Sequence, residues 1–334
     1  MLFQPAIIAL LLASGVAVAM LAAAAPFAVQ VIRQWDIASG SERQLALERR
    51  TYLFSTLAVF VMAVQLVALL LFVFNADRMA EMFVGAMCAV GTLNVNPYGF
   101  PALLAQMAVF FLAAAWLAVN HVDTRAPDYP LVRIKYALLL ILLPALLLSF
   151  GLQLKYFLGL KADVITSCCG SLFSADAPTL ASEVSALEPK PALLTFYGTL
   201  IAAIGLAGWH WQRRDNLSGA ATGLASLGAF VAAIAGILAF VSLYIYEHPH
   251  HHCPFCILKP EYDYQGYGLY IPLFAAAAAG MSAGVLRLFA GHPSLAPVIP
   301  AVTQRLAAVA AIGFALFLIV ASIMIWHSNL ILLE

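Results

Sequence analysis

Thiol and imidazole groups are concentrated in one short segment of this sequence, His248-Pro249-His250-His251-His252-Cys253-Pro254-Phe255-Cys256. Four imidazoles and two thiols lie within nine residues. Cys253 and Cys256 have the spacing of a redox dithiol, whose sulfurs close a disulfide or let one thiolate attack while the other resolves. The segment therefore predicts thiol–disulfide chemistry or metal binding.

The metal interpretation uses the same side chains. Neutral imidazoles and thiolates suit zinc and copper, and thiolates favour Cu(I) in particular. A solvated His-rich loop that holds no metal is the alternative. The candidate ligands are His248, His250, His251, His252, Cys253, Cys256 and, at the end of the last predicted helix, His327.

Three further cysteines lie elsewhere in the chain: Cys88, Cys168 and Cys169. A disulfide between the neighbours Cys168 and Cys169 would close a strained small ring, so we expect two thiols or two separate partners. Cys88 lies in an apolar stretch, where it is either a small buried hydrophobic residue or a resolving thiol. Because five is an odd number, one thiol stays unpaired unless an external partner takes it.

The composition is that of a membrane protein, with 64% hydrophobic and 10% charged residues, against roughly a quarter charged in soluble domains. Lipid admits only helices or closed barrels, and the Ala/Leu-rich stretches lack the short alternation of strands. We expect an all-α polytopic protein with eight transmembrane helices in a single domain, 1–334, and no cleaved signal peptide, since residues 1–32 lack a positive n-region. The uncharged stretches, each able to hold the ~20 apolar residues of a span, are 1–32, 51–76, 82–122, 136–154, 191–212, 216–246, 264–286 and 306–333.

The connecting loops differ in their positive charge. Loops with many Lys and Arg residues resist translocation, which predicts that both termini lie outside a bacterial cytoplasmic membrane. The loops 77–100, 155–190 and 247–270 then form an extracytoplasmic cap that carries all five cysteines. Eleven positive residues lie on the cytoplasmic side against five outside; the eleven are Arg33, Arg43, Arg49, Arg50, Arg125, Arg133, Lys135, Arg213, Arg214, Arg287 and Arg305.

Helical hairpins are predicted to repeat, because three helices open with a proline and end near a histidine: Pro101 to His121, Pro191 to His210 and Pro272 to His292. Asp, Glu, Lys and Arg are absent near the middle of every predicted helix, which disfavours an ion pump. Gln65 and Gln106 are expected to make hydrogen bonds between helices.

The sequence also bears on nucleotide, nucleic acid and haem as ligands. The chain lacks Walker, Rossmann and kinase glycine patterns and has no basic cluster, so we expect neither nucleotide nor nucleic acid as a ligand. A bis-histidine b-type haem would need His121 and His210 on facing helices. Each of these histidines could equally cap a helix C-terminus, so haem is not expected.

The residues Glu247-His248-Pro249 and Cys253-Pro254-Phe255-Cys256-Ile257-Leu258-Lys259 resemble the Cys-x-x-Cys segment of the DsbB and vitamin K epoxide reductase families, over about a dozen residues. The resemblance implies that the pair passes electrons from thiols to a quinone. Members of those families have four or five helices and a separable second cysteine pair. This chain instead predicts eight helices and carries the vicinal Cys168-Cys169.

Three hypotheses follow. In the first, the chain is a thiol–disulfide relay in which Cys253 and Cys256 exchange with Cys168 or Cys169, and Cys88 is the resolving thiol. In the second, the chain handles copper or zinc at the outer cap. In the third, it is a membrane subunit of a transport or electron-transfer complex, whose structural disulfides shape loops that dock a periplasmic or membrane protein. The first two hypotheses require the cysteine-bearing loops to meet on one side of the bilayer.

Overall fold

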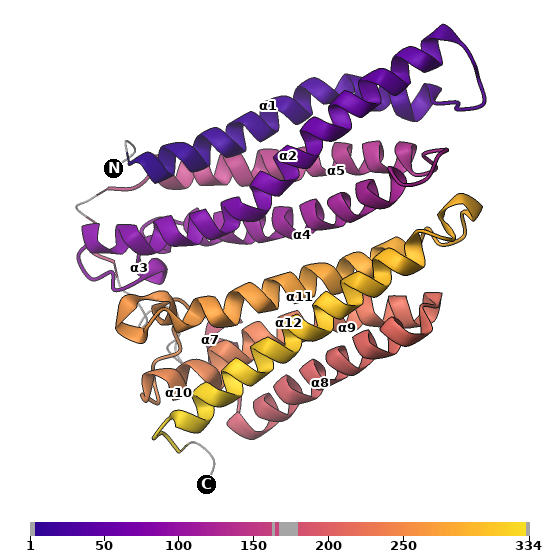
Figure 1. The fold of residues 1–334 in the computed structure, drawn as a ribbon. Coiled ribbons are helices and arrows are strands. Elements are labelled where there is room, and N and C mark those ends of the chain that lie inside the picture. Colours follow the sequence, from indigo (N-terminus) through magenta and orange to yellow (C-terminus); the bar gives the residue numbers. More distant parts are fainter. Residues whose placement is uncertain (1–3, 162–163, 167–179, 332–334) are drawn as a thin grey trace. The chain divides into compact units, whose positions relative to one another are not determined.

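The computed structural model describes residues 4–161, 164–166 and 180–331, and these residues form a helical protein (Figure 1). Eight helical segments among them are long and apolar enough to cross a membrane, which confirms the predicted fold class. The spans are α1 (Pro5–Gln34), α2 (Glu42–Arg78) with the short helix η1 (Met79–Met82), α4 (Gly99–Asp123), α5 (Val132–Leu158), α8 (Pro189–Arg213), α9 (Asn216–Gly236) continuing through the π-helical η2 (Ile237–Val241) into α10 (Ser242–Tyr246), α11 (Gln265–Arg287) and α12 (Ile299–His327). The shorter elements are α3 (Ala89–Leu93), α7 (Leu180–Ser185), η3 (Cys256–Leu258), η4 (Pro260–Tyr262) and η5 (Pro293–Leu295).

Several helices continue past charged residues at their ends, so they are longer than the uncharged stretches that predicted them. The fourth span begins at Val132 and therefore includes Lys135, which is 1% exposed. Its ammonium lies 2.7 Å from the buried carboxylate of Asp123 and donates a hydrogen bond to Asn120. A buried charge needs such a partner, so an ion pair joins the end of α4 to the start of α5.

The third predicted hairpin departs from the proline–histidine pattern. Pro272 lies inside α11 rather than at its start, and the helix ends at Arg287, before His292. A proline within a helix removes one backbone hydrogen bond but is tolerated in membrane spans, where neighbouring groups compensate. An internal repeat of hairpins therefore stays a prediction.

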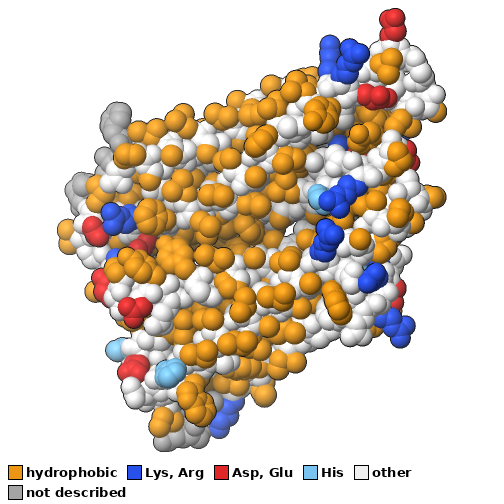
Figure 2. All heavy atoms as spheres, in the orientation of Figure 1, with side chains coloured by type: hydrophobic (Ala, Val, Ile, Leu, Met, Phe, Trp, Pro, Cys, Tyr) orange, Lys and Arg blue, Asp and Glu red, His pale blue; other side chains and the backbone are white. Residues whose placement is uncertain are grey.

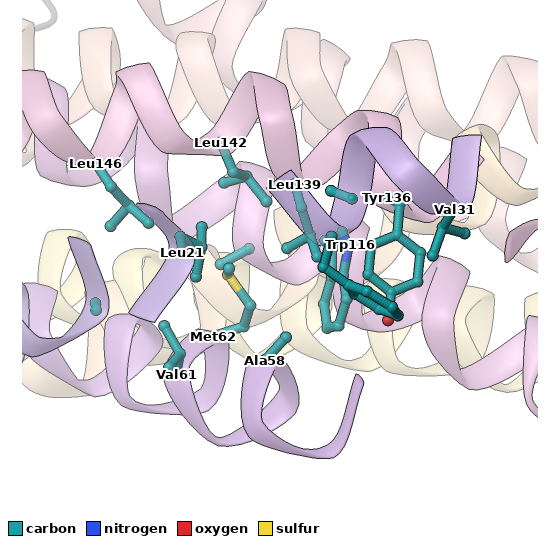
Figure 3. Packing of buried hydrophobic residues seen from close by; sticks show 14 of the residues in the cluster. Leu21, Val31, Ala58, Val61, Met62, Trp116, Tyr136, Leu139, Leu142 and Leu146 are labelled. Carbon is teal, nitrogen blue, oxygen red and sulfur yellow. The ribbon is translucent and has the colours of Figure 1, made fainter. Parts of the chain in front are cut away.

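Residue contacts divide the chain into two compact units. Unit 1 consists of Met1–Asn75, Val95–Lys161 and Phe289–Ile299; unit 2 consists of Ala76–Asn94, Ala162–Leu288 and Pro300–Glu334. Apolar side chains from α1, α2, α4 and α5 fill the core of unit 1 (Figure 3). Those labelled in the figure are Leu21, Val31, Ala58, Val61, Met62, Trp116, Tyr136, Leu139, Leu142 and Leu146.

Buried amide side chains also connect the helices of unit 1. Gln106 on α4 donates to the side-chain oxygen of Gln65 on α2 at 3.4 Å, which confirms the predicted hydrogen bonding between helices. Its own oxygen accepts from Gln153 on α5 at 2.7 Å and from Ser149 at 2.9 Å. Polar groups far from water need such partners, so the network fixes how these helices pair.

Small residues let the helices of unit 2 pack closely. A Cβ atom at Gly223 of α9 would lie 2.9 Å from the Cα of Gly284 on α11, so the two backbones touch here. At the start of α9, the side chain of Asp215 accepts the backbone N–H of Ser218 at 2.7 Å. The hydrogen bonds from Ser218 hold the pKa of Asp215 below its ordinary value.

Apolar side chains cover the middles of the helices, and charged side chains gather at the helix ends, on the face seen in Figure 2. Large apolar residues remain exposed on helices of both units, such as Phe60 at 66% in unit 1 and Leu224 at 73% in unit 2. A soluble protein rarely exposes apolar surface on this scale. This pattern supports a multi-pass membrane protein in contact with lipid.

Candidate functional site

Three sulfur atoms converge inside unit 2. The Sγ atoms of Cys88, Cys253 and Cys256 all lie within 4.8 Å of one another, and those of Cys88 and Cys253 are 3.3 Å apart. All three residues are buried, with exposures of 0%, 0% and 5%. The loop between α2 and α4 and the loop between α10 and α11 therefore meet at one end of this unit.

The segment that carries Cys88 is held by Thr166. The backbone N–H of Thr166 donates to Val84 at 3.0 Å, and its hydroxyl donates to the carbonyl of Gly91 at 2.8 Å. Gly85 has a φ of +86°, and a Cβ there would lie 2.1 Å from the carbonyl oxygen of Thr166, so only glycine fits. These contacts hold the segment around Cys88, which is the buried N-cap residue of α3.

Two tyrosines brace the Cys253-Pro254-Phe255-Cys256 segment. The hydroxyl of Tyr246 donates to the carbonyl of Cys253 at 2.5 Å and accepts the N–H of Ile257 at 2.9 Å. The hydroxyl of Tyr270 donates to the carbonyl of Pro254 at 2.6 Å. No local pattern in the sequence indicates this role, because Tyr270 lies 16 positions after Pro254.

A carboxylate lies beside the sulfur site. Asp77, near the end of α2, accepts the backbone N–H of Ala89, the residue after Cys88. Its charge interacts with the Cys88 thiol and with the Lys259 ammonium. Sequence reasoning missed Asp77, because nothing in its spacing links it to a cysteine segment more than 170 positions further along the chain.

The imidazole rings of the candidate histidine ligands do not join the group of three sulfur atoms. His252 directs Nδ1 to the carbonyl of Leu238 at 2.7 Å, and the ring of His251 stacks on Tyr246 with centroids 4.0 Å apart. His248 and His250 are exposed, with ring centroids 6.1 Å apart. Among the residues that the structure describes, the group of ligand atoms within 4.8 Å contains the three sulfurs and no imidazole nitrogen.

The other predicted site residues lie apart from this group or outside the described chain. His327 lines a cavity with Tyr244 and Glu247, and it is not a member of the sulfur group. Cys168 and Cys169 lie outside the described residues. The two histidines considered for haem belong to different units, His121 to unit 1 and His210 to unit 2, and His210 is buried with Nδ1 2.7 Å from the hydroxyl of Ser218.

Two kinds of chemistry suit three sulfurs at these distances. A thiophilic metal ion bound at about 2.3 Å holds its sulfur ligands roughly 3.5–4 Å apart, which is close to the observed spacing. Thiol–disulfide exchange needs one sulfur in contact with another, and the 3.3 Å between Cys88 and Cys253 is such a contact rather than a covalent bond of about 2.05 Å. Metal binding and thiol–disulfide exchange both use the thiolate form of cysteine.

Comparisons of the chain with protein-family models, with curated proteins and with solved structures returned no match.

Proposed function

We propose that this chain is a membrane protein that binds a soft metal ion, Cu(I) or Zn(II), through Cys88, Cys253 and Cys256. One observation carries the proposal: three sulfurs from two distant loops meet within 4.8 Å of one another. Thiolates are the ligands that such ions prefer. A purely structural role for Cys88 as a small hydrophobic residue would not require its sulfur to meet the other two.

Burial favours a small ligand over a protein substrate. The sulfurs of reactive dithiols attack from partly exposed positions, whereas Cys253, the first cysteine of the pair, is 0% exposed. A metal ion reaches such a site through small movements of the surrounding loops. A partner protein would need one of the sulfurs at the surface.

The distribution of positive charge among the loops indicates which side of the membrane the sulfur site faces. The segments 77–94 and 247–264 fall in loops that are poor in Lys and Arg, while Arg213, Arg214 and Arg287 lie at the opposite ends of α8 and α11. Positive loops stay in the cytoplasm. We therefore place the sulfurs at the extracytoplasmic face of a bacterial cytoplasmic membrane.

Metal content tests the proposal. Protein purified in detergent from cells grown with copper or zinc should contain about one metal ion per chain. Cys88→Ser, Cys253→Ser and Cys256→Ser should each lower that content severalfold, because three ligands share the ion. His250→Ala is the matched control; it removes an exposed candidate ligand outside the sulfur group and should keep the metal. Metal that survives all three serine variants would contradict the proposal.

Thiol–disulfide exchange is the second candidate function, favoured by the contact between Cys88 and Cys253. In this reaction the Cys88 thiolate attacks the Cys253 sulfur of a Cys253–Cys256 disulfide. The Cys88–Cys253 bond forms as the Cys253–Cys256 bond breaks, and Cys256 leaves as a thiolate, so no net oxidation occurs within the chain. Net electron transfer then requires a dithiol or disulfide on a periplasmic or membrane protein partner.

Thiol trapping separates the two functions. Membranes from cells grown with a reductant or an oxidant are alkylated rapidly. If the site binds metal, the three thiols should be reduced and protected from alkylation in both conditions. A Cys253–Cys256 disulfide that appears and disappears with the redox conditions would instead favour exchange. A role as a subunit of a larger complex stays a prediction, and copurification of a stoichiometric partner tests it.

A further inference from the structure

Unit 2 also contains a cavity whose lining residues include none of the three cysteines. The cavity has a volume of about 420 Å³ and opens where α10 ends, α11 begins and the last turns of α12 pass by. Pockets of this size hold small ligands. Tyr244 lines this cavity, whereas Tyr246 two residues later braces the cysteine segment, so α10 presents different faces to the two sites.

The wall that α12 contributes to the cavity changes from apolar to polar along the helix. Val320, Ile323, Met324 and His327 all line it, and their spacing places them on one face of the helix. His327 is the last residue of α12. The apolar part therefore lies within the span and the polar part at its end, where a membrane helix meets water.

Polar groups that lack partners among the described residues meet at this end of the cavity. Glu247, Gln265 and His327 line it. The side-chain amide of Gln265 and the imidazole ring of His327 make no hydrogen bond to a described residue. Glu247 uses Oε1 to accept both the backbone N–H of Asn329 at 2.9 Å and its side-chain amide at 2.8 Å. The second carboxylate oxygen of Glu247 has no such bond to the described part of the chain.

Glu247 is the C-cap residue of α10. Its φ of +52° lies in the left-handed region, which is costly for residues other than glycine. The carboxylate ends up fixed by Asn329 at the cavity. Lys and Arg are absent from the residues that line the cavity, so the charge offered to a ligand is negative.

We propose that this cavity binds a phospholipid whose headgroup carries a primary ammonium, such as ethanolamine. One acyl chain lies along Val320, Ile323 and Met324, and the ammonium group donates to the second carboxylate oxygen of Glu247. Gln265 and His327 hydrogen-bond the rest of the headgroup. The same carboxylate repels a lipid with a net negative headgroup, so the site selects by charge as well as by shape.

Competition between lipids tests the selectivity. The protein is delipidated in detergent, placed in vesicles of equal phosphatidylethanolamine and phosphatidylglycerol, and analysed for retained lipid by native mass spectrometry. We expect one retained phosphatidylethanolamine per chain. Glu247→Gln should lower the preference for phosphatidylethanolamine about tenfold, because one charge-assisted hydrogen bond is lost. Glu261→Gln is the control; it changes an exposed carboxylate outside the cavity and should leave the preference unchanged.

Two further variants test the cavity itself. Met324→Trp fills the apolar part and should abolish retention, whereas Ile319→Trp places the same ring on an exposed position of α12 outside the cavity and should not. Dodecylamine should displace the lipid, and free ethanolamine at the same concentration should not, because the tail contributes to binding. Equal retention of both lipids by the wild type, or equal behaviour of each variant and its control, would overturn the proposal.

Discussion

At the scale of single residues, hydrogen bonds to the backbone hold the sulfur site in place. Tyr246 serves both as donor to Cys253 and as acceptor for Ile257, and Tyr270 serves as donor to Pro254. Pro254 itself limits the backbone between the two cysteines. These hydrogen bonds therefore position the loop that carries the sulfurs of Cys253 and Cys256.

Tyr246→Phe should weaken this arrangement. It removes the partner of the Cys253 carbonyl and of the Ile257 N–H, and groups left unsatisfied away from water each cost about 1–3 kcal/mol. We expect metal affinity, measured by competition with a chelator of known affinity, to fall about tenfold or more.

Tyr264→Phe is the matched control for this substitution, because Tyr264 is 55% exposed and does not brace the cysteine segment. It should keep the affinity of the wild type. Equal affinities in Tyr246→Phe and the wild type would show that the bracing hydrogen bonds do not position the sulfurs.

The cysteine residues themselves were predictable as candidates, but their arrangement was not. The spacing of Cys253 and Cys256 is local and visible in the sequence. The contact between Cys88 and Cys253 joins residues 165 positions apart, which no local pattern encodes. The directions of His251 and His252 depend on Tyr246 and Leu238, so the clustered histidines could not be assigned from spacing alone.

At the scale of helices, close packing between α9 and α11 fixes the frame that carries the cysteine loop. Gly223→Ala should separate these helices, because its Cβ would lie 2.9 Å from the Gly284 Cα and neither backbone can give way. We expect a loss of about 1–3 kcal/mol, the usual cost of overpacking, in the free energy of unfolding measured in mixed detergent micelles.

Gly228→Ala provides the comparison on the same helix. A Cβ there meets nothing within 4 Å, and alanine favours the helix by up to about 1 kcal/mol over glycine. Stability should therefore stay unchanged or rise. A similar loss in both variants would mean that helix packing at Gly223 is not the cause.

The helices were the most predictable part of the structure, since a span must be apolar along ~20 residues and charges interrupt it. Their ends were less predictable. Lys135 enters α5 because Asp123 neutralises it, and that partner lies across a turn. The third proline, Pro272, lies inside α11 rather than at its start, because a membrane helix tolerates an internal proline.

At the scale of the whole molecule, the distribution of positive charge predicts which side of the membrane each loop occupies. In a cysteine-free variant, Glu261→Cys should react with a membrane-impermeant maleimide in intact spheroplasts, because its loop is predicted to face outward. Ser41→Cys is also exposed but lies two residues before Arg43 in a positive loop, so it should react only after lysis. The opposite labelling would place the sulfur site in the cytoplasm.

X-ray absorption at the edge of the bound metal tests most directly whether the three sulfurs form one centre. We predict sulfur neighbours at about 2.3 Å in the wild type, with a smaller sulfur contribution in Cys88→Ser, the residue farthest in sequence from the other two. A spectrum with only nitrogen and oxygen neighbours, or one that is unchanged in Cys88→Ser, would contradict a shared thiolate site.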